Sequence, residues 1–146
     1  MNILFFLTPK SEVDCVYEDD NLREALSRME SRQFTTIPII NEKTGRYVGT
    51  LSEGDLLRDI AKREDTVLKL EEEKPVMKVK RKRDYRCVRA SSDMEELVDS
   101  AMSQNFVPVV DDTGTFIGII TRKAILQRMV STLQELQDET QEQKIS

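Results

Sequence analysis

Apolar and polar positions along the chain follow the same succession of patterns twice. In the first copy, alternation and β-branched residues predict three short strands, at residues 13–17, 37–40 and 47–51. Apolar residues at helical spacing predict two helices, the first with Leu22, Ala25, Leu26 and Met29 and the second with Leu56, Leu57, Ile60 and Ala61. Asp20 or Asn21 can cap the first helix, and Ser52 begins the second. The first unit is therefore predicted as β-α-β-β-α.

The second copy has the same order, with strands expected at residues 86–89, 107–110 and 116–120. Ser92 and Glu95 have the spacing of a capping box and open a helix whose inner face holds Met94, Leu97, Val98, Ala101 and Met102. The closing helix starts at Thr121 and carries a longer apolar stripe, made of Ile125, Leu126, Met129, Val130, Leu133 and Leu136. Because this stripe outruns its equivalent in the first unit, we expect a partner surface to cover it.

These patterns predict an α+β fold in which two β-α-β-β-α repeats share one core. The expected boundaries are 1–64 for an apolar lead-in and the first repeat, 65–77 for a charged linker, 78–137 for the second repeat and 138–146 for a polar tail that frays.

Composition excludes several classes of protein. The net charge of −5 argues against a general binder of nucleic acid or membrane surfaces, and no apolar run is long enough to span a membrane. The opening residues, MNILFFL, lack the features of a signal peptide, so we expect a cytoplasmic protein. The chain has no histidine, which removes histidine-based catalysis and histidine-ligated zinc. Cys15 and Cys87 occupy matching strand positions and are expected to be buried free thiols without a function.

The segment from Thr36 to Leu57 returns as the segment from Val107 to Leu126. Three pairs of residues carry the match, namely Pro38 with Pro108, Gly49 with Gly118, and Ser52 with Thr121. Each motif alone is weak, but their ordered repetition is specific. On these residues the chain resembles a free-standing tandem pair of CBS domains of the bacterial type, also called a Bateman module.

That resemblance implies two units packed with pseudo-twofold symmetry, whose clefts bind adenosine-containing ligands such as AMP, ATP, S-adenosylmethionine or cyclic dinucleotides. The run from Gly49 to Asp55 matches the family signature Gly-x-x-Ser/Thr-x-x-Asp. Ser52 and the amides of the helix start can receive phosphate, and Asp55 can accept hydrogen bonds from a ribose diol. The same Ser-x-x-Asp spacing is also that of a capping box, so both interpretations stay open.

In the second repeat Ala124 stands where the signature has an acid. A ribose clamp is therefore impossible at that position, and the two clefts are expected to be unequal. We expect the Asp55 cleft to be the better nucleoside site, with the Thr121 cleft vacant or occupied in another manner.

The resemblance implies further ligand contacts around the strand that holds Pro38. Thr36 and Ile37 resemble the segment that reads the adenine edge, and in the second repeat Val107 and Pro108 are the counterparts of Ile37 and Pro38. Thr8 and Lys10 resemble the entry to the first strand, where a threonine often touches phosphate or ribose. Alternatively, these residues form only a hairpin edge and a turn.

A basic run, KVKRKR at residues 78–83, stands out in this acidic chain. It allows three interpretations: a solvated face or linker, the wall of a phosphate pocket that includes Lys80, Lys82 and Arg83, or a weak, salt-sensitive contact with nucleic acid. A phosphate pocket would favour ADP, ATP or cyclic di-AMP over AMP.

The predicted function is a non-enzymatic sensor that binds AMP, ADP, ATP or cyclic di-AMP between its repeats and signals to an unidentified partner protein. No cofactor is expected, no nucleophile has an evident base, and a homodimer through the apolar stripe of the closing helix is expected. The alternative is a scaffold for protein interaction that binds no small molecule, and nucleic-acid binding is a third, less favoured possibility.

Overall fold

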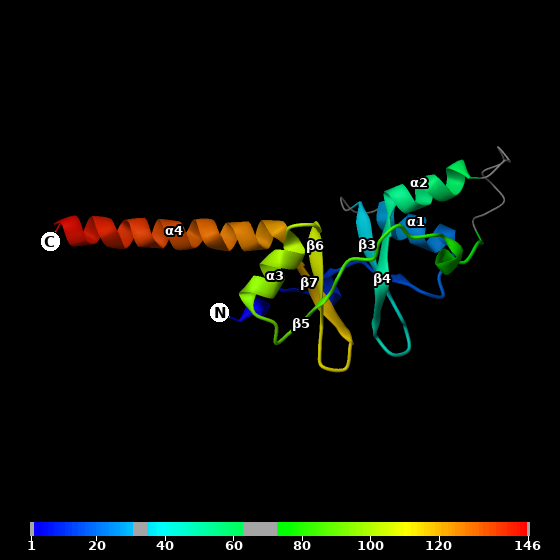
Figure 1. Cartoon of the computed structure of the whole chain (residues 1–146), viewed down its shortest axis with the longest axis horizontal. Coiled ribbons are helices and arrows are strands. Elements are labelled where there is room, and N and C mark those ends of the chain that lie inside the picture. Colours follow the sequence, from blue (N-terminus) through cyan, green and yellow to red (C-terminus); the bar gives the residue numbers. More distant parts are fainter. Residues whose placement is uncertain (1, 31–34, 63–72, 146) are drawn as a thin grey trace.

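The computed structural model describes residues 2–30, 35–62 and 73–145 of the chain. The elements in chain order are η1 (Ile3–Phe6), β1 (Thr8–Pro9), η2 (Lys10–Glu12), β2 (Val16–Tyr17), α1 (Leu22–Glu30), β3 (Thr36–Ile40), β4 (Tyr47–Ser52), α2 (Glu53–Ala61), η4 (Val76–Lys78), β5 (Val88–Arg89), α3 (Met94–Ala101), β6 (Phe106–Val110), β7 (Phe116–Thr121) and α4 (Arg122–Ile145). Figure 1 shows two sheets side by side, with α1 and α2 beside one, α3 beside the other, and α4 projecting away.

Each repeat builds its own sheet in the same way. In the first, β2 runs parallel to β3 because α1 returns the chain to the same end, and β4 closes the hairpin. In the second, β5 runs parallel to β6 across α3, and β7 closes the hairpin. The predicted α+β fold of two β-α-β-β-α repeats is confirmed.

The tips of the two hairpins meet in a reciprocal arrangement. Arg46 and Thr115, which occupy equivalent positions in the repeats, form an antiparallel bridge. The Tyr47 amide donates to the Gly114 carbonyl at 3.3 Å, and the equivalent Phe116 amide donates to the Gly45 carbonyl at 2.9 Å. This exchange of equivalent bonds marks a local pseudo-twofold axis between the repeats.

The N-terminal segment joins the second sheet, although it precedes the first repeat in sequence. β1 pairs antiparallel with β7, with Thr8 opposite Ile119 and Pro9 opposite Gly118. Gly118 has φ of +157°, and a Cβ at this position would collide with the Thr8 carbonyl oxygen. Glycine is therefore required where the two strands approach each other.

The segment before β5 covers the first sheet in a similar way. The Thr50 amide donates to the Asp84 carboxylate at 3.0 Å, and the Tyr85 amide donates to the Thr50 hydroxyl at 3.0 Å. A Cβ at Gly49 would collide with the Asp84 carboxylate. Thus Gly49 and Gly118 both admit a chain segment from outside their own hairpin.

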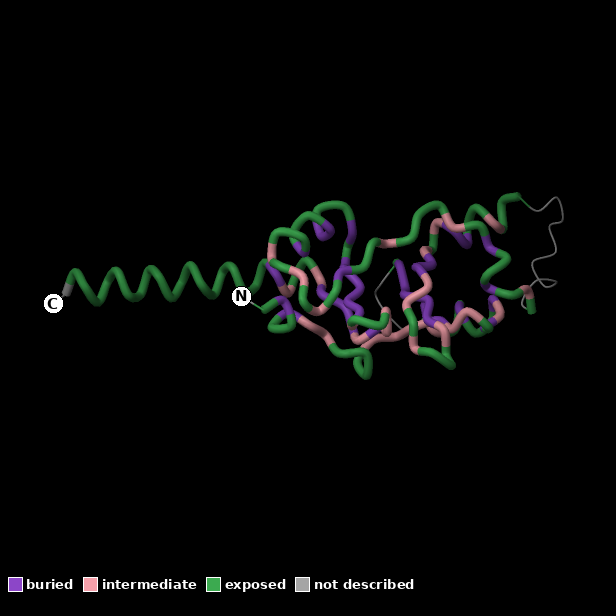
Figure 2. The backbone as a smooth tube through the Cα atoms, turned by 60° about the horizontal axis from the view of Figure 1, so that its bottom comes forward, coloured by how far each residue is buried: buried purple, intermediate pink, exposed green. Residues whose placement is uncertain are grey.

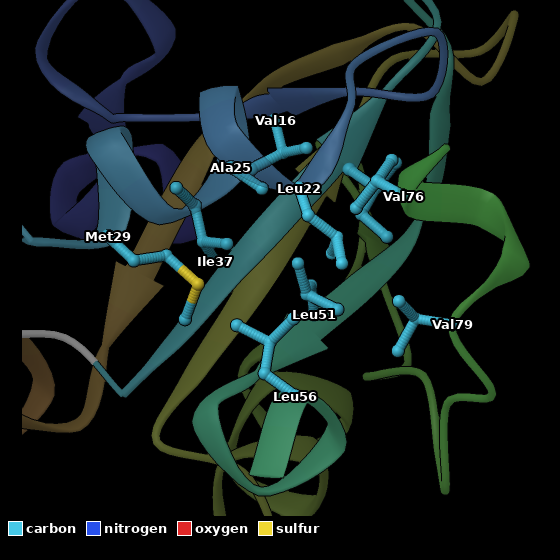
Figure 3. Packing of buried hydrophobic residues seen from close by; sticks show 10 residues of the cluster. Val16, Leu22, Ala25, Met29, Ile37, Leu51, Leu56, Val76 and Val79 are labelled. Carbon is cyan, nitrogen blue, oxygen red and sulfur yellow. The ribbon is translucent and has the colours of Figure 1, made fainter. Parts of the chain in front are cut away.

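Three apolar clusters hold the fold together. Figure 3 shows the cluster of the first repeat, to which the segment after residue 72 adds two fully buried valines, Val76 and Val79. The second cluster combines Ile3 of η1 with buried residues of the second repeat. A third cluster joins the sheets, because Ile40 of β3 packs with Phe106 and with two residues of β7, Phe116 and Ile119. The two halves therefore share buried contacts as predicted.

Helix capping agrees with the sequence in part. The Asn21 side chain accepts from the Glu24 amide and caps α1, as one of the two residues expected there. The expectation for Ser92 is wrong, because α3 is capped one residue later by Asp93, which accepts from the Glu96 amide. The Ser92 hydroxyl instead accepts from the Arg89 amide and closes the preceding turn.

Other element boundaries differ from the predicted ones. The strand expected at 13–17 contains only Val16 and Tyr17, since η2 occupies the chain just before it. The tail from residue 138 does not fray but continues α4 to Ile145. Most of the predicted linker lies outside the described residues, and its described end packs onto the start of α1 through the 2.9 Å bond from the Leu22 amide to the Lys74 carbonyl.

Substitution of Gly118 by alanine tests the close approach of β1. The new Cβ forces β1 away from β7, so the free energy of unfolding should fall by about 1–3 kcal/mol in urea titrations. Gly54→Ala is the matched control, because Gly54 lies in α2 and its Cβ would meet only flexible side chains. Equal stability of the two variants would contradict this account of Gly118.

Candidate functional site

A cavity of about 220 Å³ lies where the N-terminal segment and both repeats meet. Its walls come from the segment around η2, from α1 and β3 of the first repeat, and from β6 and β7 of the second. The lining residues are Thr8, Glu12, Val13, Asp14, Arg28, Met29, Thr36, Ile37, Pro38, Phe106, Ile119 and Thr121. This cavity is the candidate functional site.

The cavity brings together five residues predicted from the sequence, namely Thr8, Thr36, Ile37, Pro38 and Thr121. β3 starts at Thr36 and β7 ends at Thr121, so both lie at the end of their sheets that is opposite the hairpin tips. Pairing of β1 with β7 then places Thr8 at the same end. The sheet topology therefore gathers three hydroxyl groups around one apolar space.

Thr121 also marks the start of α4. Its hydroxyl oxygen accepts a hydrogen bond from the Ala124 amide at 3.1 Å and so caps the helix, while the hydroxyl proton stays available to an acceptor. Helix starts attract anions because their first amide groups lack partners within the helix. The cavity thus has a phosphate-binding group on its second-repeat wall.

Charged side chains line the opposite wall. Arg28 forms an ion pair with Asp20 at 2.7 Å, donates to the Cys15 carbonyl at 2.8 Å, and lies 4.8 Å from the centroid of the Tyr17 ring. These contacts hold the guanidinium in place beside the cavity. Asp14, on the segment between η2 and β2, contributes a half-buried carboxylate to the lining.

Asp55 lies outside this cavity, and the protein itself supplies its hydrogen-bond partners. The carboxylate is 2 % exposed and accepts from the Ser52 amide and from the Lys82 amide, each at 3.0 Å. Arg58 forms an ion pair with it, and the Asp55 amide donates to the Ser52 hydroxyl. Ser52 and Asp55 therefore form the capping box that the sequence allowed.

The Asp84 carboxylate lies against Gly49 and Thr50 of β4. Burial disfavours ionisation of this carboxyl, but the Arg81 guanidinium and the Thr50 amide outweigh burial and hold the pKa of Asp84 below its ordinary value. A charged Asp84 is thus anchored over Gly49.

The remaining predicted site residues are dispersed. Val107 packs in the core of the second repeat, and its neighbour Pro108 is also buried. Lys10 begins η2 outside the cavity lining. Arg83 donates to the Ser103 carbonyl at 2.7 Å. The structure does not bring these residues to the cavity.

Lys80 and Lys82 line a different hollow, a groove of about 500 Å³ between α2 and the segment before β5. The groove is predominantly basic, and its lining residues are Arg58, Asp59, Lys62, Lys78, Lys80 and Lys82. Lys74 neutralises Asp59 at 2.9 Å, so the groove has an excess of positive charge. The basic run therefore contributes to a groove that is separate from the threonine-lined cavity.

The sequence interpretation missed several cavity residues. Arg28 lies in α1 beside the apolar residues that predict the helix, and Asp14 falls within the strand predicted at residues 13–17. Neither residue belongs to a motif that would identify it as a ligand contact. Phe106 lies just before the strand predicted at residues 107–110, whereas β6 begins at Phe106 itself.

The expectation of two buried thiols is met only in part, because Cys15 is partly buried. Burial raises the pKa of the Cys15 thiol to about 12, whereas Cys87 is exposed, contrary to expectation, because it lies before the short edge strand β5.

Among residues 2–30, 35–62 and 73–145, no group of three or more acidic or cysteine side chains could hold a metal ion. Within the same residues, none of the helices has the length and apolar character needed to cross a membrane.

Comparisons with known proteins agree with this architecture. The family model named CBS domain matches residues 7–62 and 76–131. An uncharacterized protein of Methanocaldococcus jannaschii is 29% identical over 144 residues, which cover 79% of this chain and 84% of the relative.

Two solved structures of proteins named CbpB are similar to this chain. One, in complex with c-di-AMP, has a TM-score of 0.82 and 26% identity, with coverage of 95% of this chain and 91% of the other. The second, from Streptococcus agalactiae, has a TM-score of 0.76 and 27% identity, with coverage of 94% and 85%. The chain therefore belongs to the CBS domain family, and it carries two CBS domains in tandem.

Proposed function

We propose that this protein is a non-enzymatic regulatory module that binds an adenine nucleotide in the cavity between its repeats. The observation that carries the proposal is the convergence of Thr8, Thr36 and Thr121 on one apolar space bounded by both repeats. The similar CbpB protein in complex with c-di-AMP supports a nucleotide as the ligand.

The cavity walls suit a purine base. Ile37 and Ile119 offer aliphatic surface from opposite repeats, and Phe106 adds an aromatic ring. Ligand sites typically combine such apolar walls with a few polar groups that fix orientation. The hydroxyl groups and the start of α4 supply these groups, whereas the charge of Arg28 is already paired with Asp20.

The size of the cavity favours one nucleoside at a time. Its volume of about 220 Å³ is below the range of roughly 300–1,000 Å³ that is common for drug-sized ligands. AMP, ADP and ATP would therefore place only their nucleoside in the cavity, with the phosphates toward Thr121 and the start of α4. Cyclic di-AMP would place one adenosine in the cavity and the other beyond it.

A ribose acceptor is needed because Ala124 replaces the acid of the family signature. We assign this role to Asp14, the half-buried carboxylate of the cavity lining. A carboxylate has about four acceptor positions, so Asp14 can bind ribose hydroxyls in addition to its interaction within the protein.

A ligand in this cavity would contact both repeats, and this position gives a mechanism for signalling. The hairpin tips are bonded to each other at Arg46 and Thr113, whereas the cavity lies at the opposite end of the sheets. A nucleotide there would change the angle between the repeats and thereby the surface offered to a partner protein. A coupling of about 1–3 kcal/mol is sufficient for such a switch. The module is also proposed to work as a homodimer.

A ligand-free scaffold remains the second candidate, favoured by the length of exposed apolar surface on α4. If the protein is such a scaffold, its affinity for the partner protein should be the same with and without nucleotide.

Thermal unfolding with AMP, ADP, ATP and cyclic di-AMP tests nucleotide binding. A ligand at a hundred times its dissociation constant should add about 2.7 kcal/mol and raise the unfolding midpoint by several degrees. Thr36→Val, which removes one cavity hydroxyl, should weaken the active ligand roughly threefold to tenfold. Thr140→Val makes the same change on exposed α4 and should leave the dissociation constant unaltered. Absence of any shift with all four nucleotides would refute the proposed function.

Asp55→Asn separates the cavity from the Asp55 region. The Asp55 carboxylate is buried and accepts from the Ser52 amide, the Lys82 amide and Arg58. Its replacement by a neutral amide should lower the free energy of unfolding by about 1–3 kcal/mol. The nucleotide dissociation constant, measured by calorimetry on folded protein, should not change. A large loss of affinity at equal folded fraction would place the nucleotide at Asp55 instead.

Asp14→Asn tests the ribose contact with AMP and its 2′- and 3′-deoxy analogues. The native protein should prefer AMP over at least one deoxy analogue by about tenfold, and the variant should lose most of this preference, because an amide accepts a weaker hydrogen bond than a carboxylate. Asp19→Asn, the same change at an exposed position outside the cavity lining, should retain the preference. Unaltered discrimination in Asp14→Asn would overturn this role while leaving nucleotide binding intact.

A further inference from the structure

The basic run at residues 78–83 is sorted by its alternation into two sets of side chains. Val79 is buried in the core of the first repeat. Arg81 pairs with Asp84 at 2.8 Å, and Arg83 donates to the Ser103 carbonyl at 2.7 Å. Residues two apart in an extended segment lie on the same side of it. The groove beside α2 is accordingly lined by the lysines at the alternate positions, Lys78, Lys80 and Lys82.

Two contacts fix the lysine-bearing segment against α2. The buried Asp55 carboxylate accepts from the Lys82 amide at 3.0 Å and pairs with Arg58 of α2. One turn further along the helix, Asp59 pairs with Lys74 at 2.9 Å. In Figure 1 the segment after η4, drawn in green, runs back past α2 toward β5, and Figure 2 colours the end of α2 as exposed. The groove therefore has two anchored walls at the surface.

The groove carries positive charge that the chain does not neutralise. Asp59 is the one carboxylate among the described lining residues, and Lys74 already pairs with it. Within the part of the chain that the structure describes, no ion pair joins a carboxylate to the four exposed lysines of the lining, Lys62, Lys78, Lys80 and Lys82. A hollow lined by charges of one sign concentrates ions of the other sign.

The lining favours the phosphates of a ligand over any base. Every described lining residue is charged, and none is aromatic or aliphatic, so a purine would find no stacking surface there. Lysine binds phosphate as a compact point charge. The lining comes from α2, its last turn and the segment before β5, and includes no residue of β3, β4, β6 or β7. The groove thus lies outside the space between the repeats.

We propose that this groove is a second ligand site, which binds a short chain of phosphates such as inorganic triphosphate. Such a chain engages several ammonium groups at once, whereas orthophosphate engages fewer. The tail of a nucleoside triphosphate presents the same chemistry. Nucleic acid is less suited, because the lining offers no aromatic side chain for stacking and the chain has a net charge of −5.

Calorimetric titration of the full chain with inorganic triphosphate, pyrophosphate and orthophosphate, at constant ionic strength, tests the site. Affinity should rise severalfold with each added phosphate, because more ammonium groups are engaged. Lys80→Gln combined with Lys82→Gln should weaken triphosphate binding at least tenfold. Equal affinity for the three anions, or no binding of triphosphate at about 1 mM, would overturn the proposal.

The matched control combines Lys43→Gln with Lys144→Gln, which removes the same charge from exposed positions outside the groove. This variant should retain the native affinity for triphosphate. Both double variants should unfold at a midpoint no lower than that of the native protein, since the glutamine at position 82 keeps the backbone amide that bonds to Asp55. An equal loss of affinity in both would show that only the overall charge matters, and the groove would not be a site.

Further probes identify the source of the phosphates and separate the groove from the nucleotide cavity. Binding of ATP that depends on Lys80 and Lys82, without binding of inorganic triphosphate, would overturn recognition of the phosphate chain itself. Tighter lysine-dependent binding of a single-stranded oligonucleotide than of triphosphate would overturn it in favour of nucleic acid. AMP should bind the native protein and the Lys80→Gln, Lys82→Gln variant equally. A protein that binds AMP but no triphosphate refutes only the groove, and the reverse refutes only the cavity.

Discussion

The architecture depends on strand edges that are covered by chain from outside each hairpin. β1 covers β7 at Gly118, and the segment around Asp84 covers β4 at Gly49. Without these segments each hairpin would expose unpaired backbone groups, which carry a cost in free energy. Since β1 precedes the first repeat yet completes the second sheet, the two halves cannot be separated without loss. The same crossing places Thr8 beside the cavity that also includes Thr121.

The fold could be predicted because its information is local and repeated. Strands with β-branched residues, helical spacing of leucines and the recurring Pro and Gly positions indicate the order of elements directly. Thr36, Ile37 and Thr121 were also predictable as site residues, because each has a fixed place in a repeated motif. Once the strands form, their register brings these residues to the same end of the sheets.

The rest of the site depends on tertiary contacts that the sequence does not display. One spacing of Ser52 and Asp55 serves either a ligand or a helix cap, and only the bonds from Lys82 and Arg58 show how the carboxylate is occupied. Asp14 and Arg28 reach the cavity through irregular chain and a helix flank, where no periodic pattern identifies them. Asp93 replaces Ser92 as a cap for a similar reason, since a neighbouring turn recruits the serine hydroxyl.

The bond between the hairpin tips has a mechanical consequence for α4. Arg46 restrains the repeats at one end of their interface, so relative motion must be a rotation about that end rather than a translation. α4 contains 24 residues, extends roughly 36 Å and follows β7 without an intervening loop. A rotation of about 5° would displace the far end of such a lever arm by roughly 3 Å, estimated from the helix rise. A small closure around a bound molecule would thus be amplified at a distant surface.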